Sequence, residues 1–255
     1  MKPVEVHYTI EGPHDAPVVL LSGSIGSSTD MWLPQREALA DEYRVISCDH
    51  RGHGKSPVPP GPYSVAEMAT DVLALLDRLD VEKAHFCGLS LGGAIGMWLG
   101  RYHPHRIDQL VLACTSANFG PKEMWADRID LARKEGMEWI AGLSMPRWLT
   151  QGFIDQEPQT AERVRTMLAS TPLDGYTGAC EAIGDWDFAD KLPDLPTPTL
   201  VIAGSEDPST PPEHAREIAA LVPRSRMVVL DGAAHLANVQ RAPEFTDLLR
   251  AHLLG

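Results

Sequence analysis

The sequence lacks an excess of positive charge and has no long apolar run. It carries 22 lysines and arginines against 35 aspartates and glutamates, and this net charge of −13 argues against nucleic-acid binding, because phosphate contacts need basic side chains. Its apolar stretches fall well short of the ~20 residues that a membrane-spanning helix needs. Residues 1–5 lack the apolar centre of a secretion signal. We therefore expect neither a nucleic-acid partner nor a membrane partner.

Cysteine is also scarce, with only Cys48, Cys87, Cys114 and Cys180 in 255 residues. Three of them lie inside apolar strand-like runs, and their spacing fits no metal site. This usage is typical of small buried residues in a reducing compartment, so we expect a cytoplasmic protein without a bound metal.

Apolar runs of strand length alternate with helical patterns along most of the chain. The runs occur at residues 18–21, 43–48, 85–87, 110–114, 199–203 and 226–230, and an alternating half-exposed strand is predicted at 4–10. Helices are predicted between them, at residues 32–42, 65–79, 93–102, 212–221 and 243–254. This alternation predicts an α/β fold with a mostly parallel central sheet flanked by helices.

The alternation breaks between residues 120 and 191, where only helical stretches occur, around 126–135, 137–143, 160–169 and 175–183. We expect residues 120–191 to form a helical cap, or lid, inserted into an α/β core made of residues 1–119 and 192–255. Four of the six tryptophans lie in this region, namely Trp125, Trp139, Trp148 and Trp186. They either line an apolar pocket or pack among the cap helices.

The stretch Gly88-Leu89-Ser90-Leu91-Gly92 connects a strand-like run to a helix-like run. At so sharp a turn the central residue takes a positive φ, and only small residues fit two positions away on either side. Ser90 would then project as a nucleophile, and the backbone N–H of Leu91 could bind an anion. An ordinary glycine-rich turn is the alternative, because the pattern Gly-x-Ser-x-Gly also arises by chance.

Two more reactive residues follow the ends of predicted strands. Asp207 comes after the strand at 199–203 and His235 after the strand at 226–230. Because the carboxyl ends of parallel strands share one edge of the sheet, we expect Ser90, Asp207 and His235 to gather there, in the chain order of the α/β-hydrolases. His235 would take the serine proton and Asp207 would orient the imidazole, with Glu206 as a rival for the acid.

A loop of small residues, 22–28, follows the first buried strand. Its backbone amides could line an anion hole, and a solvated loop is the alternative. We predict that the N–H groups of Ser24 and Leu91 hold the oxyanion, with Ile25 as the fallback for Ser24.

Other motifs suggest structural roles. Gly54-Lys55-Ser56 resembles the end of a phosphate-binding loop, but Asp49 stands where that motif requires glycine. His50 and His53 have no third ligand at a suitable spacing for a metal, so a structural loop is expected. The histidines expected at surfaces or helix ends are His7, His14, His103, His105, His214 and His252.

Together with these motifs, most of the chain resembles the 3-oxoadipate enol-lactonases, α/β-hydrolases of aromatic-compound catabolism (the β-ketoadipate pathway). The triad motifs specify only the superfamily, whereas the cap pieces and the proline-rich loop resemble the lactonases in particular. The resembling stretches are residues 49–63 (DHRGHGKSPVPPGPY), 85–93 (HFCGLSLGG), 125–129 (WADRI), 167–176 (MLASTPLDGY), 199–212 (TLVIAGSEDPSTPP) and 234–239 (AHLANV).

The resemblance implies a cofactor-free hydrolase that opens 3-oxoadipate enol-lactone to 3-oxoadipate through an acyl-enzyme on Ser90. The substrate is a small anionic lactone, and in an acidic protein its carboxylate needs a local cation, for which Arg128, Arg133 and Arg147 are candidates. Arg128 is favoured by its place near Trp125, and a solvated helix arginine is the alternative. The predicted substrate-binding residues are Trp125, Arg128, Trp148 and Ile25.

The chain departs from the enol-lactonases at Gly23, where they often carry asparagine and the general hydrolase pattern has glycine. The chain also begins near the second strand of the fold, so we expect the first strand to be missing, and we expect no decarboxylase domain after Gly255. The sequence leaves the oligomeric state open. Hydrolysis of another ester, a thioester or a C–C bond, a perhydrolysis reaction, and a non-catalytic small-molecule receptor are the alternative functions.

Overall fold

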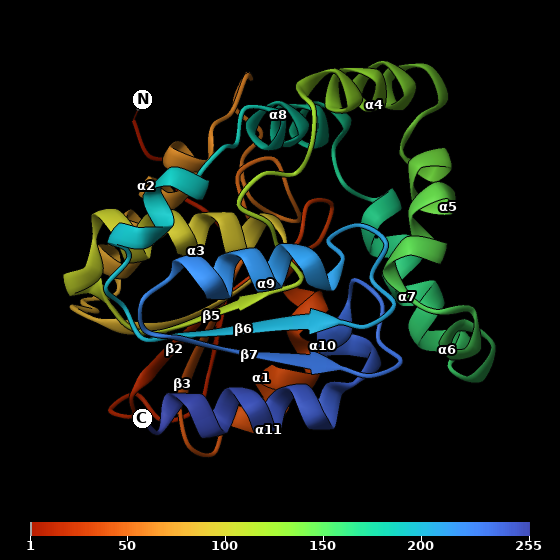
Figure 1. Ribbon diagram of the computed structural model, residues 1–255. Helices are drawn as coiled ribbons and strands as arrows, with labels where there is room; N and C mark the ends of the chain where they lie inside the picture. Colours follow the sequence, from red (N-terminus) through yellow and green to blue (C-terminus); the bar gives the residue numbers. More distant parts are fainter. Residues whose placement is uncertain (1) are drawn as a thin grey trace.

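The computed structural model describes residues 2–255 and contains a seven-stranded sheet with helices on both faces (Figure 1). The strand order is β1-β3-β2-β4-β5-β6-β7, and β1 is antiparallel to β3 while the other neighbouring strands are parallel. The predicted α/β-hydrolase fold with a mostly parallel sheet is confirmed. The strands are β1 Tyr8–Glu11, β2 Val18–Ser22, β3 Arg44–Cys48, β4 Ala84–Leu89, β5 Ile107–Ala113, β6 Thr199–Gly204 and β7 Ser225–Leu230.

The predicted strand at 4–10 is wrong at its start, because β1 begins only at Tyr8. Before it, the backbone N–H of Val4 donates to the Asp71 carboxylate at 2.8 Å, and the N–H of His7 donates to the Ser56 hydroxyl at 2.8 Å. These backbone groups are therefore satisfied by side chains and not by a neighbouring strand.

Helices cover both faces of the sheet (Figure 1). Helix α2 begins at a capping box, in which the Ser64 hydroxyl accepts the Glu67 N–H and the Glu67 carboxylate accepts the Ser64 N–H. One face carries α1 Leu33–Leu39 and α11 Ala242–Leu253, and the other carries α2 Val65–Arg78, α3 Leu91–Tyr102 and α9 Pro212–Leu221. Shorter segments are η1 Thr29–Trp32, η2 Pro104–Arg106, η3 Ala189–Asp194 and α10 Ala237–Gln240.

Five helices stand between β5 and β6 in the chain, where only helices were predicted. They are α4 Lys122–Glu135, α5 Met137–Trp148, α6 Gln151–Gln156, α7 Pro158–Ala169 and α8 Leu173–Gly184. We call this segment the insertion. Helix α6 was not predicted, because its six residues are too few to show a periodic pattern. In Figure 1 the arrowheads of β6 and β7 point toward the side on which α5, α6 and α7 lie, so the insertion stands at the carboxyl edge of the sheet.

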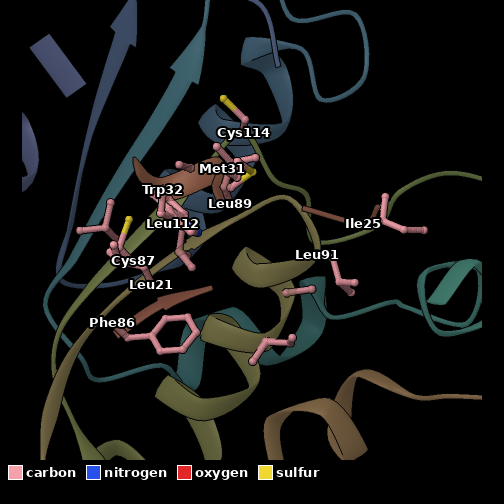
Figure 2. Close-up of a cluster of buried hydrophobic side chains, with 14 of the residues drawn as sticks. Leu21, Ile25, Met31, Trp32, Phe86, Cys87, Leu89, Leu91, Leu112 and Cys114 are labelled. Atoms are coloured by element: carbon pink, nitrogen blue, oxygen red, sulfur yellow. The ribbon is translucent and has the colours of Figure 1, made fainter. Parts of the chain in front are cut away.

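The core is built around the middle strands of the sheet. Figure 2 shows Phe86 and Leu89 of β4 with Leu21 of β2 and Leu112 of β5, and these side chains have no exposed area. All four cysteines are buried and unpaired, as expected, and burial raises the pKa of the Cys48 thiol to about 12. Within residues 2–255, no helix combines the length and the apolar character needed to cross a membrane.

Candidate active site

Ser90 occupies a sharp turn between β4 and α3. Its φ is 57°, the positive value predicted for this position. A Cβ on Gly88 would lie 2.1 Å from the Gly92 carbonyl oxygen, and a Cβ on Gly92 would lie 2.1 Å from the Ser22 carbonyl oxygen. No side chain fits at either position, which explains the two glycines. The turn therefore has the geometry of a nucleophile elbow.

Asp207 and His235 are in direct contact. The Asp207 Oδ2 atom lies 2.8 Å from Nδ1 of His235, and both residues are buried. Burial opposes ionisation of Asp207, but the charge of His235 and hydrogen bonds from His235 and Thr210 outweigh it and lower the pKa of this carboxyl. Since Nδ1 of His235 is held by a carboxylate, Nε2 is the ring nitrogen that can act as a base.

The acid is held by a turn that sequence reasoning missed. The Thr210 hydroxyl donates to Asp207 Oδ2 at 2.6 Å, and the backbone N–H groups of Ser209 and Thr210 donate to Oδ1 at 2.8 and 3.0 Å. An Asp followed closely by Ser and Thr is a turn pattern and could have predicted these contacts. The rival acid Glu206 is exposed, whereas Asp207 lies against the histidine.

Ser90 lies at the same edge of the sheet as this pair. Its N–H donates to the Ala113 carbonyl at the end of β5, at 2.9 Å. The N–H of the next residue, Cys114, donates to the Ile202 carbonyl of β6 at 2.8 Å. Burial and then the Asp207 charge raise the pKa of the Cys114 thiol well above its ordinary value. The ends of β4, β5 and β6 thus bring the serine and the acid into one neighbourhood, as the strand order predicts.

The loop at residues 23–28 lies next to the start of α3. The N–H of Gly92 donates to the Gly23 carbonyl at 2.9 Å, and the Thr171 hydroxyl of the insertion donates to the Gly26 carbonyl at 3.2 Å. Within residues 2–255, no acceptor is bound to the N–H of Ser24 or Ile25. Figure 2 shows Ile25 and Leu91 beyond the ends of β2 and β4. The loop therefore offers backbone donors near the elbow.

The insertion contacts both loops that carry the acid and the histidine. The Arg147 guanidinium donates to the carbonyl of Pro208, next to Asp207, at 3.0 Å, and the N–H of Leu236 donates to the Trp148 carbonyl at 2.9 Å. Trp148 itself is buried, with 5% of its surface exposed. The last turn of α5 is thus attached to the core at the candidate site.

Arg128 of α4 contacts the neighbouring insertion helices α8 and α5. Its guanidinium donates to the Tyr176 hydroxyl at 2.6 Å and to the Ser144 hydroxyl at 2.9 Å. In the described part of the chain no carboxylate forms an ion pair with it. The Tyr176 ring lies 3.6 Å from the position of a Cβ on Gly26. Among the described residues, Arg128 is therefore a cation without an ion-pair partner. It contacts Tyr176, whose ring lies near Gly26 of the 23–28 loop.

Trp125 lies elsewhere, at the start of the insertion. The Trp125 indole N–H donates to the Phe119 carbonyl at 3.2 Å. A Cβ added to Gly184 would lie 3.2 Å from the Cβ of Trp125. Of the other tryptophans in the insertion, Trp139 is 43% exposed and Trp186 is buried and stacked on Phe188. Trp148 is bonded to the histidine loop through its backbone carbonyl, and the Trp186 indole N–H donates to the Ser116 carbonyl at 3.0 Å.

His252 lies in the last turn of α11, at a helix end as expected. It is buried, however, and its Nε2 lies 3.1 Å from the Leu110 carbonyl oxygen. Within residues 2–255 no group of three His, Cys, Asp or Glu side chains is placed to hold a metal ion.

A groove of about 1240 Å³ separates the insertion from the core. It is lined by Thr171, which binds the 23–28 loop, and by Gln240, which follows the histidine loop, but not by Ser90, Asp207 or His235. The groove therefore lies at the boundary between the insertion and the core, and Ser90, Asp207 and His235 do not line it.

A doubly wound sheet with a serine elbow and a buried aspartate–histidine pair defines a hydrolase of the α/β class. In agreement, residues 18–248 match the alpha/beta hydrolase family, and the chain belongs to this family.

The resemblance to enol-lactonases is confirmed by individual relatives. The chain is 37% identical to 3-oxoadipate enol-lactonase 2 of Acinetobacter baylyi, over 97% of this chain and 92% of that protein. The crystal structure of the enol-lactonase from Burkholderia xenovorans LB400 matches with a TM-score of 0.96 at 38% identity, covering 99% of this chain and 97% of that chain. A protein of Pseudomonas syringae provisionally named the carbamate hydrolase RutD is 32% identical over 94% of both chains.

Proposed function

We propose that this protein opens 3-oxoadipate enol-lactone to 3-oxoadipate in the cytoplasm, as a step of aromatic-compound catabolism in the β-ketoadipate pathway. The observation that carries the proposal is the buried Asp207–His235 pair, 2.8 Å apart, at the sheet edge where the Ser90 elbow ends β4. The named activity of the Acinetobacter baylyi relative supports this lactone as the substrate.

The reaction proceeds through an acyl-enzyme. His235 takes the proton of Ser90 on Nε2, because Nδ1 is engaged with Asp207, and the serine oxygen attacks the lactone carbonyl. The imidazolium then gives the proton to the departing enolate oxygen, so the ring opens while the acyl group stays on Ser90. Water activated by His235 releases the product, and the enol becomes the ketone. Asp207 remains ionised throughout and stabilises the imidazolium.

The N–H groups of Ser24 and Leu91 stabilise the oxyanion of each tetrahedral intermediate. Both lie at the elbow, one on the 23–28 loop and one at the first residue of α3. A preorganised donor of this kind typically contributes ~3 kcal/mol to transition-state stabilisation. Ile25 is the alternative donor on the same loop.

Arg128 binds the free carboxylate of the lactone. Its two contacts in the protein are the neutral hydroxyls of Tyr176 and Ser144, which orient the guanidinium and leave its charge available. The insertion, residues 120–191, serves as the cap that covers the bound substrate. Ile25 and Trp148 form apolar walls of the pocket, and Trp125 supports the helix that carries Arg128.

The decisive experiment measures kcat/KM of the purified protein for the enol-lactone, neutral esters and a small carbamate. Wild type should prefer the lactone, and Ser90→Ala should lose turnover by several orders of magnitude while it stays folded. Arg128→Met should lower kcat/KM about 10- to 100-fold for the anionic lactone and much less for a neutral ester. Arg133→Met, which removes an exposed cation of the same helix, is the matched control.

The outcomes separate the parts of the proposal. Turnover that persists in Ser90→Ala would disprove the mechanism. Faster turnover of carbamates, the reaction named for the Pseudomonas syringae relative, would disprove the lactone assignment and leave the serine mechanism in place. Equal losses in Arg128→Met and Arg133→Met would show that Arg128 does not bind the carboxylate.

A further inference from the structure

Two neighbouring residues, Asp49 and His50, hold the two ends of the 23–28 loop. The Nε2 atom of His50 lies 3.0 Å from the carbonyl oxygen of Gly23. The Asp49 carboxylate accepts the backbone N–H of Thr29 at 2.7 Å. Both residues follow β3 and are buried, with 2% and 4% of their surfaces exposed for Asp49 and His50. The loop that carries Ser24 is therefore anchored from β3 as well as from its own strand.

The contact at Gly23 sets the direction of the Ser24 N–H. The carbonyl of Gly23 and the N–H of Ser24 belong to one planar trans peptide and point in opposite directions. The Gly23 oxygen receives two donors, Nε2–H of His50 at 3.0 Å and the N–H of Gly92 at 2.9 Å. Gly92 follows Leu91, so the peptide is fixed relative to the other oxyanion donor. His50 occupies the second lone pair of the oxygen and restricts rotation of the peptide.

The contact with the Gly23 carbonyl needs a proton on Nε2 of His50. Burial lowers the pKa of His50, against the smaller effects of the Gly23 carbonyl and of the nearby Asp49 and Asp71 charges. A neutral imidazole that donates to a carbonyl through Nε2 carries its one proton on that atom. His53 is the other buried histidine in the segment that follows β3. It makes a different contact, from Nδ1 to the Arg51 carbonyl at 3.0 Å.

We propose that His50 is a positioning residue of the oxyanion hole, which fixes the Gly23–Ser24 peptide through its Nε2–H so that the Ser24 N–H faces the oxyanion. This inference rests on the proposed serine mechanism, in which Ser24 supplies one of the two donors. His50 touches neither substrate nor the reacting atoms, and it acts through the peptide that does. Its effect should appear where negative charge develops and not in ground-state binding.

The test uses three substitutions of His50 in the full-length protein. Gln places an amide N–H near the position of Nε2, Asn places it near Nδ1, and Met fills the volume without a donor. For p-nitrophenyl acetate, His50→Gln should stay within a few-fold of wild type, whereas His50→Asn and His50→Met should lower kcat about 10- to 100-fold with little change in KM. The inhibition constant of phenylboronic acid, which forms a tetrahedral anion on the serine, should rise by the same factor.

Controls distinguish positioning from general damage to the loop. His53→Gln changes the other buried histidine in the segment after β3. It should leave the inhibition constant of phenylboronic acid unchanged, whatever it does to the melting temperature. The inference is overturned if phenylboronic acid inhibits His50→Met as strongly as it inhibits wild type. It is also overturned if the kcat of His50→Gln falls as far as that of His50→Met at equal folded content. If the wild type shows no Ser90-dependent turnover of either this ester or the enol-lactone, the proposed function fails instead.

A measurement on the wild type covers the case in which the variants do not fold. Nitrogen-15 NMR of labelled histidines reports the tautomer of each ring. The inference requires a proton on Nε2 of His50 at pH 7. A neutral ring with its proton on Nδ1 would overturn it without any substitution.

Discussion

The backbone N–H of Leu236 donates to the carbonyl of Trp148 at 2.9 Å. Leu236 follows His235, and Trp148 is the last residue of α5, so the histidine loop and the insertion are directly bonded. Arg147 makes the corresponding contact with the acid loop at Pro208. A displacement of the end of α5 would therefore move the proposed acid and base together.

Gln240 strengthens this attachment and should be required for it. Its Oε1 accepts the N–H groups of Thr150 and Ala234, each at 3.2 Å, and its Nε2 donates to the Thr150 hydroxyl at 2.6 Å and to the Gly232 carbonyl at 2.7 Å. We expect Gln240→Met to lower the free energy of unfolding by about 1–3 kcal/mol, because it leaves these groups without partners. Esterase kcat should fall as well.

Urea unfolding and initial rates check this prediction. The control is Gln151→Met, since the Gln151 amide contacts only the exposed Asp155. It should change the unfolding free energy by less than about 0.5 kcal/mol. Equal effects of the two substitutions would show that Gln240 does not couple the insertion to the histidine loop.

Thr210 should matter for both stability and rate. Its hydroxyl donates to Asp207 Oδ2 at 2.6 Å, the oxygen that also meets His235. Thr210→Val leaves a buried carboxylate short of one donor, so we expect a loss of about 1.5–3 kcal/mol in the free energy of unfolding and a lower kcat. Thr210→Ser should restore most of both. A valine variant with wild-type stability and rate would rule out this role.

The stability of the protein should depend on pH through His53. Burial lowers the pKa of His53 to about 3, below its usual value of 6.5. Between these values the unfolded chain binds a proton that the folded chain does not, so stability is complete above pH 6.5 and declines as the pH falls, by up to about 1.4 kcal/mol per pH unit from this group.

His53→Asn tests this dependence, because an amide can still donate to the Arg51 carbonyl but does not titrate. Urea unfolding at pH 7.0, 6.0 and 5.0 should show a shallower decline for His53→Asn than for wild type. Some decline should remain, since burial also lowers the pKa of His50. Parallel curves for the two proteins would refute the assignment.

Gly175 allows the insertion to approach the core closely. A Cβ at this position would lie 1.9 Å from the Gly52 carbonyl oxygen, a backbone atom that cannot turn aside. We expect Gly175→Ala to lower the free energy of unfolding by about 1–3 kcal/mol. Gly142→Ala is the control, because nothing lies within 4 Å of that Cβ and alanine favours the helix by up to about 1 kcal/mol. Thermal unfolding of both variants should shift in opposite directions.

The fold could be predicted from sequence where local patterns are strong. The run at 18–21 is apolar throughout and the run at 199–203 is apolar after Thr199, as is typical of strands buried on both faces, and both are strands in the structure. The prediction failed where the pattern was weak. The start of β1 moved to Tyr8, because the N–H of Val4 bonds to the distant Asp71, and α6 was too short to detect.

The sequence by itself determined the candidates Ser90, Asp207 and His235, because each follows a recognisable strand and parallel strands bring their ends together. Only the tertiary structure decided what positions them. Gln240 and His50 act through contacts between separate segments, and His50 meets Gly23 across 27 positions in the chain. Such contacts leave no periodic signal, because they depend on how the packed segments meet and not on local backbone preference.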